Sequence, residues 1–138
     1  MSKVHWRLYY HVVWATRMRA PMIEPEIKER VLGAIRAKCE GLGIHVRELN
    51  AVADHAHLCC DIPPSLAISS AMREIKGVSS HMVNHELSPA TPFAWQEGYG
   101  VMSLSARDVR RVVEYIEQQE RHHADGSLLA PLEAADDE

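Results

Sequence analysis

The sequence predicts an α+β fold of the ferredoxin-like, split βαβ type, with one antiparallel sheet and an extra C-terminal helix that carries a tyrosine. The chain has 138 residues, of which 46% are hydrophobic, so it can form one domain with a packed core. Alternating or continuous β-prone apolar residues mark four strands, and apolar residues at helical spacing mark three helices. In chain order these are strand 4–16, helix 25–42, strand 44–52, strand 55–62, helix 65–86, strand 99–104 and helix 106–123.

Proline, glycine and capping residues set the boundaries of these elements. Pro25 suits the first turn of a helix, because its φ angle is already helical and its missing N–H needs no partner there. Only a short break at Asp54 separates the second and third strands, which indicates a hairpin. Ser105 caps the last helix, and Asp108 follows three residues later. We expect the first six elements to form one sheet with helices on one face.

Acidic residues collect at the C-terminal end. The formal net charge is -4, and five acidic residues without any Lys or Arg follow Ala124. Without those five, 14 acidic residues face 15 basic ones, a net charge of +1. We therefore divide the chain into a domain of residues 1–124 and an acidic tail of residues 125–138, which we expect to be mobile. A nearly neutral body attracts phosphate only weakly at long range, so nucleic acid would have to bind through local basic clusters.

The cysteines and the hydropathy pattern favour a cytoplasmic protein. Cys39, Cys59 and Cys60 lie in apolar surroundings, and their odd number argues against a disulfide framework. No apolar run approaches the roughly 18 residues of a membrane span, and the N-terminus lacks the pattern of a signal peptide. We expect reduced, packed thiols and no association with a membrane.

The segment from Asp54 to Ile62 contains the sharpest chemical feature. In a strand, His55 and His57 project from the same face, where two imidazoles can bind one metal ion. The alternative is a pair of half-exposed strand histidines without a ligand. A structural zinc site that adds Cys59 and Asp61 is disfavoured, because ligands at four alternate strand positions cannot all converge on a tetrahedral ion.

The last helix offers a second candidate group. Tyr115 and Gln119 are four residues apart, so they lie one above the other, and His122 continues the stripe. Tyr115 could instead be an amphipathic residue whose ring packs and whose hydroxyl reaches water. In the long middle helix, Arg73 and Lys76 could contact phosphates, although a solvated helix face would have the same composition.

Four blocks of sequence together resemble the single-tyrosine HUH transposases of small bacterial insertion sequences, the IS200-like transposases. They have the order and spacing of that family and cover roughly residues 5–123, and HUH denotes His-hydrophobic-His. The blocks are Tyr10-His11-Val12-Val13-Trp14-Ala15-Thr16-Arg17, Leu49-Asn50-Ala51-Val52-Ala53-Asp54-His55-Ala56-His57-Leu58, Ile75-Lys76-Gly77-Val78-Ser79-Ser80 and Tyr115-Ile116-Glu117-Gln118-Gln119.

The resemblance implies a metal-dependent nuclease and strand transferase that acts on single-stranded DNA. His55 and His57 would hold Mg²⁺ or Mn²⁺, with Gln119 as the third protein ligand and His122 as a competitor for that place. The Tyr115 hydroxyl would attack the scissile phosphate and leave a 5′-phosphotyrosine and a free 3′-OH. A 3′-OH can then attack the phosphotyrosine and rejoin the strands.

The resemblance also implies partners. In that family the enzyme is a homodimer in which the tyrosine helix of one chain completes the metal site of the other, and its substrates are single-stranded DNA ends that contain hairpins. Candidate DNA contacts are Arg17, Arg19, Arg73 and Lys76. Two alternatives to a transposase stay open: a domesticated relative that binds or processes hairpins without transposition, and a non-catalytic ferredoxin-like module.

Overall fold

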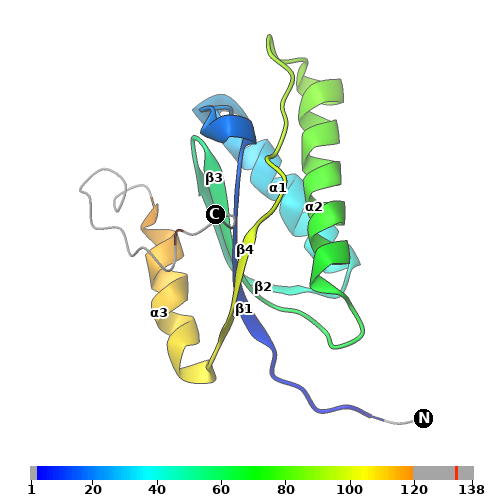
Figure 1. Ribbon diagram of the computed structural model, residues 1–138, viewed down its shortest axis with the longest axis vertical. Coiled ribbons are helices and arrows are strands. Elements are labelled where there is room, and N and C mark those ends of the chain that lie inside the picture. The colour runs from blue at the N-terminus through cyan, green and yellow to red at the C-terminus, as the bar shows by residue number, and fades with distance from the viewer. Residues whose placement is uncertain (1–2, 120–132, 134–138) are drawn as a thin grey trace.

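A four-stranded antiparallel sheet forms the centre of the computed structural model, which describes residues 3–119 and Glu133. The strands lie in the spatial order β2-β3-β1-β4 (Figure 1). This order confirms the predicted ferredoxin-like α+β fold. The elements are β1 (Tyr9–Ala15), η1 (Arg17–Arg19), α1 (Pro25–Gly41), β2 (His45–Val52), β3 (His55–Asp61), α2 (Ile68–Met82), η2 (Val83–Leu87), β4 (Gly100–Leu104) and α3 (Ala106–Glu117).

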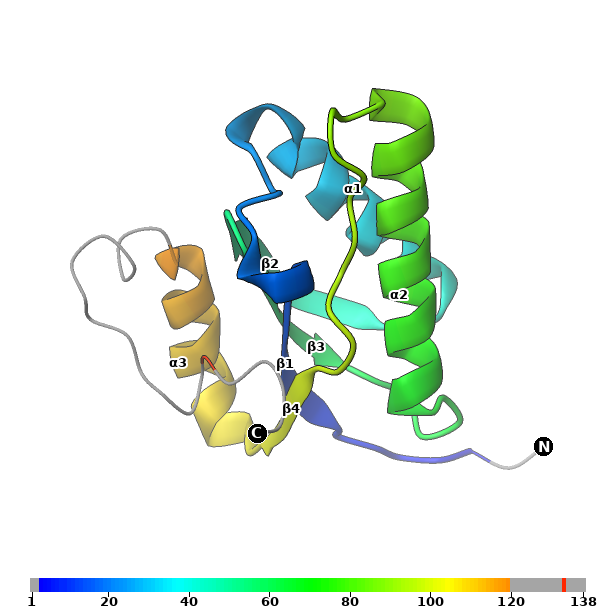
Figure 2. The same ribbon diagram turned by 45° about the horizontal axis from the view of Figure 1, so that its top comes forward.

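The helices cover both faces of the sheet. α1 and α2 pack beside each other on one face, as predicted for the first six elements, and α3 lies on the opposite face (Figures 1 and 2). The larger core lies under α1 and α2 and includes Val12, Trp14, Ile35 and Ile75. A smaller cluster lies under α3 and is centred on Val112 and Ile116.

Successive side chains of β3 point to opposite faces of the sheet, so this strand contributes to both cores. Ala56, Leu58 and Cys60 belong to the larger core, as predicted, while Cys59 packs under α3. Because β3 is hydrogen-bonded to β1 on one side and to β2 on the other, its backbone is held along its whole length. Side chains on its α3 face therefore stand on a rigid support.

The first strand is shorter than predicted. It begins at Tyr9 rather than at residue 4, and Val4 is 69% exposed. Both neighbouring strands end opposite Tyr9, where Asp61 and Leu104 are its partners, so the chain before Tyr9 has no strand to pair with. Alternating apolar residues alone do not make a strand without such a partner.

Two helices also differ from their predicted limits. α2 begins at Ile68 instead of residue 65 and continues at its end into the wider π-helical turn η2, after which Ser88 has a left-handed φ of 44°. α3 ends at Glu117, and the predicted helical residues 120–123 lie outside the part that the structure describes.

The predicted tail, residues 125–138, also lies outside the described residues, apart from Glu133. The division of the chain at residue 124 therefore stays a prediction. None of the helices within residues 3–119 has the length and apolar character that crossing a bilayer requires.

Candidate active site

His55 and His57 lie side by side on the face of β3 that α3 covers, as the alternation predicts. Their ring centroids are 5.0 Å apart, and the two residues are only 2% and 0% exposed. The two histidines are therefore buried and not half-exposed, and the bound metal ion stays a prediction. Burying two imidazoles is unfavourable unless their ring nitrogens have polar partners, so these partners define the site.

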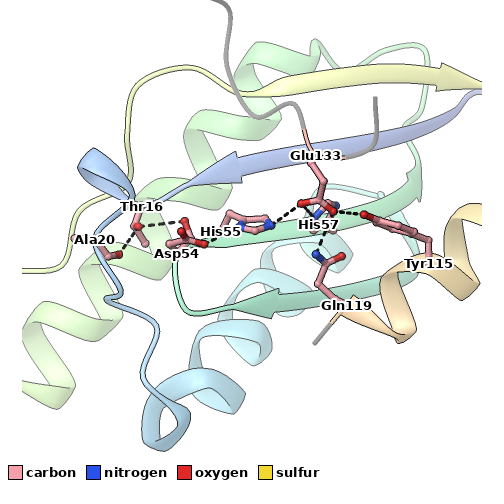
Figure 3. Close-up of polar contacts among 8 residues, drawn as sticks. All are labelled: Thr16, Ala20, Asp54, His55, His57, Tyr115, Gln119 and Glu133. Carbon is pink, nitrogen blue, oxygen red and sulfur yellow. Dashed lines mark hydrogen bonds and ion pairs between the residues drawn. The ribbon is translucent and has the colours of Figure 1, made fainter. Parts of the chain in front are cut away.

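Each of the two imidazoles has a partner at its Nδ1 atom. The Nδ1 of His55 is 2.7 Å from the Oδ1 of Asp54, and the Nδ1 of His57 is 2.9 Å from the Nε2 of His11. Asp54 is itself fixed, because its backbone carbonyl accepts hydrogen bonds from both the N–H and the hydroxyl of Thr16 (Figure 3). With Nδ1 engaged, both histidines turn Nε2 toward the same place.

α3 brings Tyr115 and Gln119 to that place. Tyr115 is buried on the last turns of α3 and Gln119 is buried just after the helix ends, and the Tyr115 ring centroid is 6.1 Å from that of His57. Asn50 on β2 fastens this end of α3, because its side-chain amide donates a 3.0 Å hydrogen bond to the carbonyl of Ile116. The helix therefore packs on the sheet of its own chain, and one chain contributes the histidines, the tyrosine and the glutamine together.

The carboxylate of Glu133 joins these residues (Figure 3). Its Oε1 lies 2.9 Å from the Nε2 of His55 and 3.3 Å from the Nε2 of His57. Its Oε2 accepts a 2.5 Å hydrogen bond from the Tyr115 hydroxyl and a 3.2 Å hydrogen bond from the Gln119 amide. One anionic group thus spans the distance between the two histidines and the tyrosine.

Sequence reasoning did not find Glu133. It assigned the acidic residues after Ala124 to a mobile tail, and nothing local distinguishes Glu133 from the other acids there. Its described partners in the site lie at least 14 residues away along the chain, so no short motif could reveal these contacts.

The electrostatics of the site favour a negative charge at its centre. Burial lowers the pKa of His55, but hydrogen bonds to Glu133 and Asp54 outweigh that effect, so its pKa is raised. Burial raises the pKa of Glu133, and hydrogen bonds from His55, His57 and Tyr115 reverse this and hold its pKa far below the usual value. With its histidines protonated, the site suits an anion. With the protons of the histidines replaced, it suits a cation.

The donor atoms fit a divalent metal ion. The Nε2 atoms of His55 and His57 and a carboxylate oxygen of Glu133 all lie within 4.8 Å of one another. The amide oxygen of Gln119 is buried and has no hydrogen-bond partner among the described residues, while the amide nitrogen of the same side chain bonds Glu133. Nitrogen and oxygen ligands in this combination suit Mn²⁺ and related ions.

The disfavoured zinc arrangement does not form. The Asp61 carboxylate is held by Arg47 through hydrogen bonds of 2.5 and 2.9 Å. Cys59 packs under α3, where burial raises the pKa of its thiol to about 11. Neither residue joins His55 and His57 in the group of possible metal ligands that the described residues form.

The four predicted DNA-contacting residues lie apart from this site. Arg17 and Arg19 are exposed in the turn η1, which follows β1. Arg73 is exposed on α2, on the opposite side of the sheet from His57. Lys76 is half-buried, donates hydrogen bonds to the carbonyls of Gln96 and Gly98, and lies over the ring of Tyr99. Arg17 and Lys76 contact the same segment, because the Arg17 N–H donates to the carbonyl of Ala94 and the Lys76 ammonium donates to the carbonyl of Gln96.

Comparison with known proteins agrees with the fold and with the family resemblance. The family described as "Transposase IS200 like" matches residues 4–119. The transposase for insertion sequence element IS200 of Salmonella typhimurium is 27% identical over 135 residues, which is 94% of this chain and 88% of that protein. The ISDra2 transposase TnpA of Deinococcus radiodurans is 22% identical over 121 residues, which is 83% of this chain and 85% of that protein.

Two solved structures share the fold. A crystal structure described as that of a transposase from Deinococcus radiodurans has a TM-score of 0.67 and 24% identity, and the match covers 86% of this chain and 98% of that one. A REP-associated tyrosine transposase bound to a REP hairpin has a TM-score of 0.67 and 19% identity, and the match covers 89% of this chain and 74% of that one. With the family match over most of its length, the chain belongs to the IS200-like transposases, a family of DNA-cutting enzymes.

Proposed function

We propose that the protein cuts and rejoins single-stranded DNA through a 5′-phosphotyrosine on Tyr115, with the help of a divalent metal ion. One observation carries the proposal. The two oxygens of a single carboxylate reach the histidine pair on one side and the Tyr115 hydroxyl on the other. A phosphodiester in the same position would present one oxygen to the histidine side and its phosphorus to the tyrosine.

Three side chains are proposed to hold the metal ion. His55 and His57 would supply Nε2 lone pairs, and Gln119 would supply its unpartnered amide oxygen. A bound Mg²⁺ or Mn²⁺ polarises phosphoryl oxygens and offsets the charge of the transition state. Asp54 fixes the ring of His55 from behind, which orients its lone pair before any ligand arrives.

Tyr115 is proposed as the nucleophile. Its hydroxyl loses the proton, its oxygen forms the new bond to phosphorus, and the bond from phosphorus to the 3′ oxygen breaks. The leaving oxygen takes up a proton and becomes a free 3′-OH. Attack by a 3′-OH on the phosphotyrosine reverses these steps and joins two strands, because the covalent link conserves the phosphodiester bond.

The partners are proposed from the family. Single-stranded DNA with hairpins is the expected substrate, and Arg17 and Arg19 of η1 together with Arg73 and Lys76 of α2 are the proposed contacts. A structural neighbour is bound to a REP hairpin, which supports a hairpin substrate. The same observation favours the second candidate function, processing of hairpins without transposition. A homodimer is proposed as the working form.

The test uses single-stranded element ends and a REP-type hairpin strand as substrates, with Mn²⁺ or with EDTA. The parent protein should form a covalent adduct with Mn²⁺ only. Tyr115→Phe should form none while keeping a melting temperature close to that of the parent, and His57→Ala should form none while remaining folded at a lower melting temperature. Adduct formation by Tyr115→Phe would exclude this tyrosine as the nucleophile. Adduct without any metal would exclude the role of the histidines.

The same two variants test how the dimer is assembled. If each site combines Tyr115 of one chain with His57 of another, a mixture of the two inactive variants regains part of the activity. If each site is built within one chain, as in the structure described above, mixing restores nothing even after subunits exchange. The substrate preference, element ends or REP-type hairpin, distinguishes transposition from hairpin processing.

A further inference from the structure

His11 is a buried imidazole to which the proposed reaction assigns no role. It lies on β1 with 0% exposure and belongs to the same layer as His57, one step diagonally across the strand pair. Its Nε2 is 2.9 Å from the Nδ1 of His57, and the two ring planes differ by only 11°. The two rings therefore share one hydrogen bond, and the position of its proton has consequences for the site.

The proton of this hydrogen bond decides which face of His57 can bind a cation. A neutral imidazole carries its proton on one nitrogen and a lone pair on the other. If His11 donates, His57 keeps its own proton on Nε2 and has no lone pair there. If His57 donates from Nδ1, its Nε2 lone pair is available on the side where Glu133 and Tyr115 lie.

We propose that His11 is a positioning residue that accepts the Nδ1 proton of His57 and so presents the Nε2 lone pair of His57 to a divalent cation. This inference rests on the proposed metal-dependent function. His11 plays for His57 the part that Asp54 plays for His55, with a neutral acceptor in place of a carboxylate. Partners of this kind orient the ring of a metal-binding histidine and raise its basicity.

Two further observations support this role. A neutral imidazole has one lone pair with which it can accept a hydrogen bond, and the Nε2 of His11 is the nitrogen that lies 2.9 Å from His57. Its Nδ1 is buried without a hydrogen-bond partner within the described part of the chain. This is where His11 would carry its own proton when it accepts from His57.

The unpartnered Nδ1 argues against a role in packing alone. A buried polar atom without a partner is unfavourable, and an apolar side chain would fill the same place without that cost. The next two residues on this face of β1, Val13 and Ala15, are apolar and fully packed. The polar residue stands only at the position that reaches the Nδ1 of His57.

The test compares two substitutions of His11 in the full-length protein. His11→Gln keeps an amide oxygen that can accept the proton of His57, whereas His11→Leu fills the space but accepts nothing. His45→Leu removes an exposed histidine of β2 and serves as the matched control. Binding of Mn²⁺ without DNA is measured from the electron paramagnetic resonance signal of the free ion, and thermal melting reports the fold.

His11→Leu should weaken Mn²⁺ binding by about tenfold or more, while His11→Gln stays within about threefold of the parent and His45→Leu binds as the parent does. Equal binding by His11→Leu and the parent overturns the inference, and so does an equal loss in the Leu and Gln variants. If the parent itself does not bind Mn²⁺, the proposed metal dependence fails instead.

A second measurement does not depend on whether the Leu variant folds. Imidazole ¹⁵N chemical shifts of the parent with Mg²⁺ should show His57 and His11 both protonated at Nδ1. A His57 protonated at Nε2 under these conditions overturns the inference.

Discussion

At the scale of single residues, the polar layer between the sheet and α3 depends on specific partners. His11, His55 and His57 are all nearly inaccessible to solvent, and each of the two site histidines has a partner at both ring nitrogens. Because buried polar groups are stable only when they are hydrogen-bonded, these contacts hold the rings in one orientation. The chemistry of the site is thus arranged before DNA binds.

The cysteines, unlike the histidines of the site, lie in apolar surroundings. Cys39 and Cys59 are fully buried, and burial raises the pKa of each thiol to about 11. Burial also raises the pKa of Cys60. Only the thiolate reacts rapidly with electrophiles, so all three should be unreactive in the folded protein at neutral pH.

We therefore predict that a thiol reagent at pH 7.5 modifies the native protein at least about 100-fold more slowly than the protein in denaturant, where all three thiols should react. The time course of a coloured disulfide reagent measures this directly. Rapid reaction of one thiol in the native protein would show that its surroundings open, and substitution of each cysteine by Ala would identify it.

At the scale of elements, the end of α3 decides whether the site is complete. Asn50 on β2 donates to the carbonyl of Ile116, one residue after the tyrosine. This hydrogen bond links the helix to a strand that also pairs with β3, since Asn50 stands opposite His57 in the β2–β3 register. Asn50 therefore helps to place Tyr115 relative to His57, together with the apolar packing of α3 on the sheet.

Asn50→Ala should lower stability by about 1 kcal/mol, the usual value of one hydrogen bond, and should reduce adduct formation more than this loss of stability explains. Asn84→Ala is the matched control, because Asn84 bonds the backbone of Phe93 away from the site. The control should lose stability but keep its activity per folded molecule. Equal effects of the two substitutions on activity would contradict the role of Asn50.

The elements were largely predictable from the sequence. Alternation and helical spacing located all seven in the order β-α-β-β-α-β-α. The limits were less predictable: the first strand is shorter because β3 and β4 end opposite Tyr9, and no local pattern records where a neighbouring strand ends. The histidine pair and Tyr115 form recognisable motifs, whereas His11 and Glu133 enter the site only through the fold.

At the scale of the whole molecule, one residue of the acidic C-terminal tail reaches the site that β3 and α3 form. Glu133 belongs to the acidic tail, yet its carboxylate lies among His55, His57 and Tyr115 with only 15% of its side chain exposed. A phosphodiester that approaches the Tyr115 hydroxyl needs the same space, and two anions cannot share it. The carboxylate therefore competes with the proposed substrate.

We predict that Glu133→Gln binds single-stranded DNA several-fold more tightly than the parent at low salt and forms the Tyr115 adduct faster. The substitution keeps the shape of the side chain but removes the negative charge of Glu133, which the site stabilises. The phosphate of the DNA then no longer competes with a carboxylate for the same place. Asp137→Asn is the control, because it also removes one negative charge from the tail and so shows how much of any change comes from net charge alone. Affinity is measured by fluorescence anisotropy with a labelled strand, and adduct by its slower migration in a denaturing gel. Equal gains in both variants would mean that the tail acts only through its overall charge, and a loss of adduct in Glu133→Gln alone would mean that the carboxylate assists the reaction instead of opposing it.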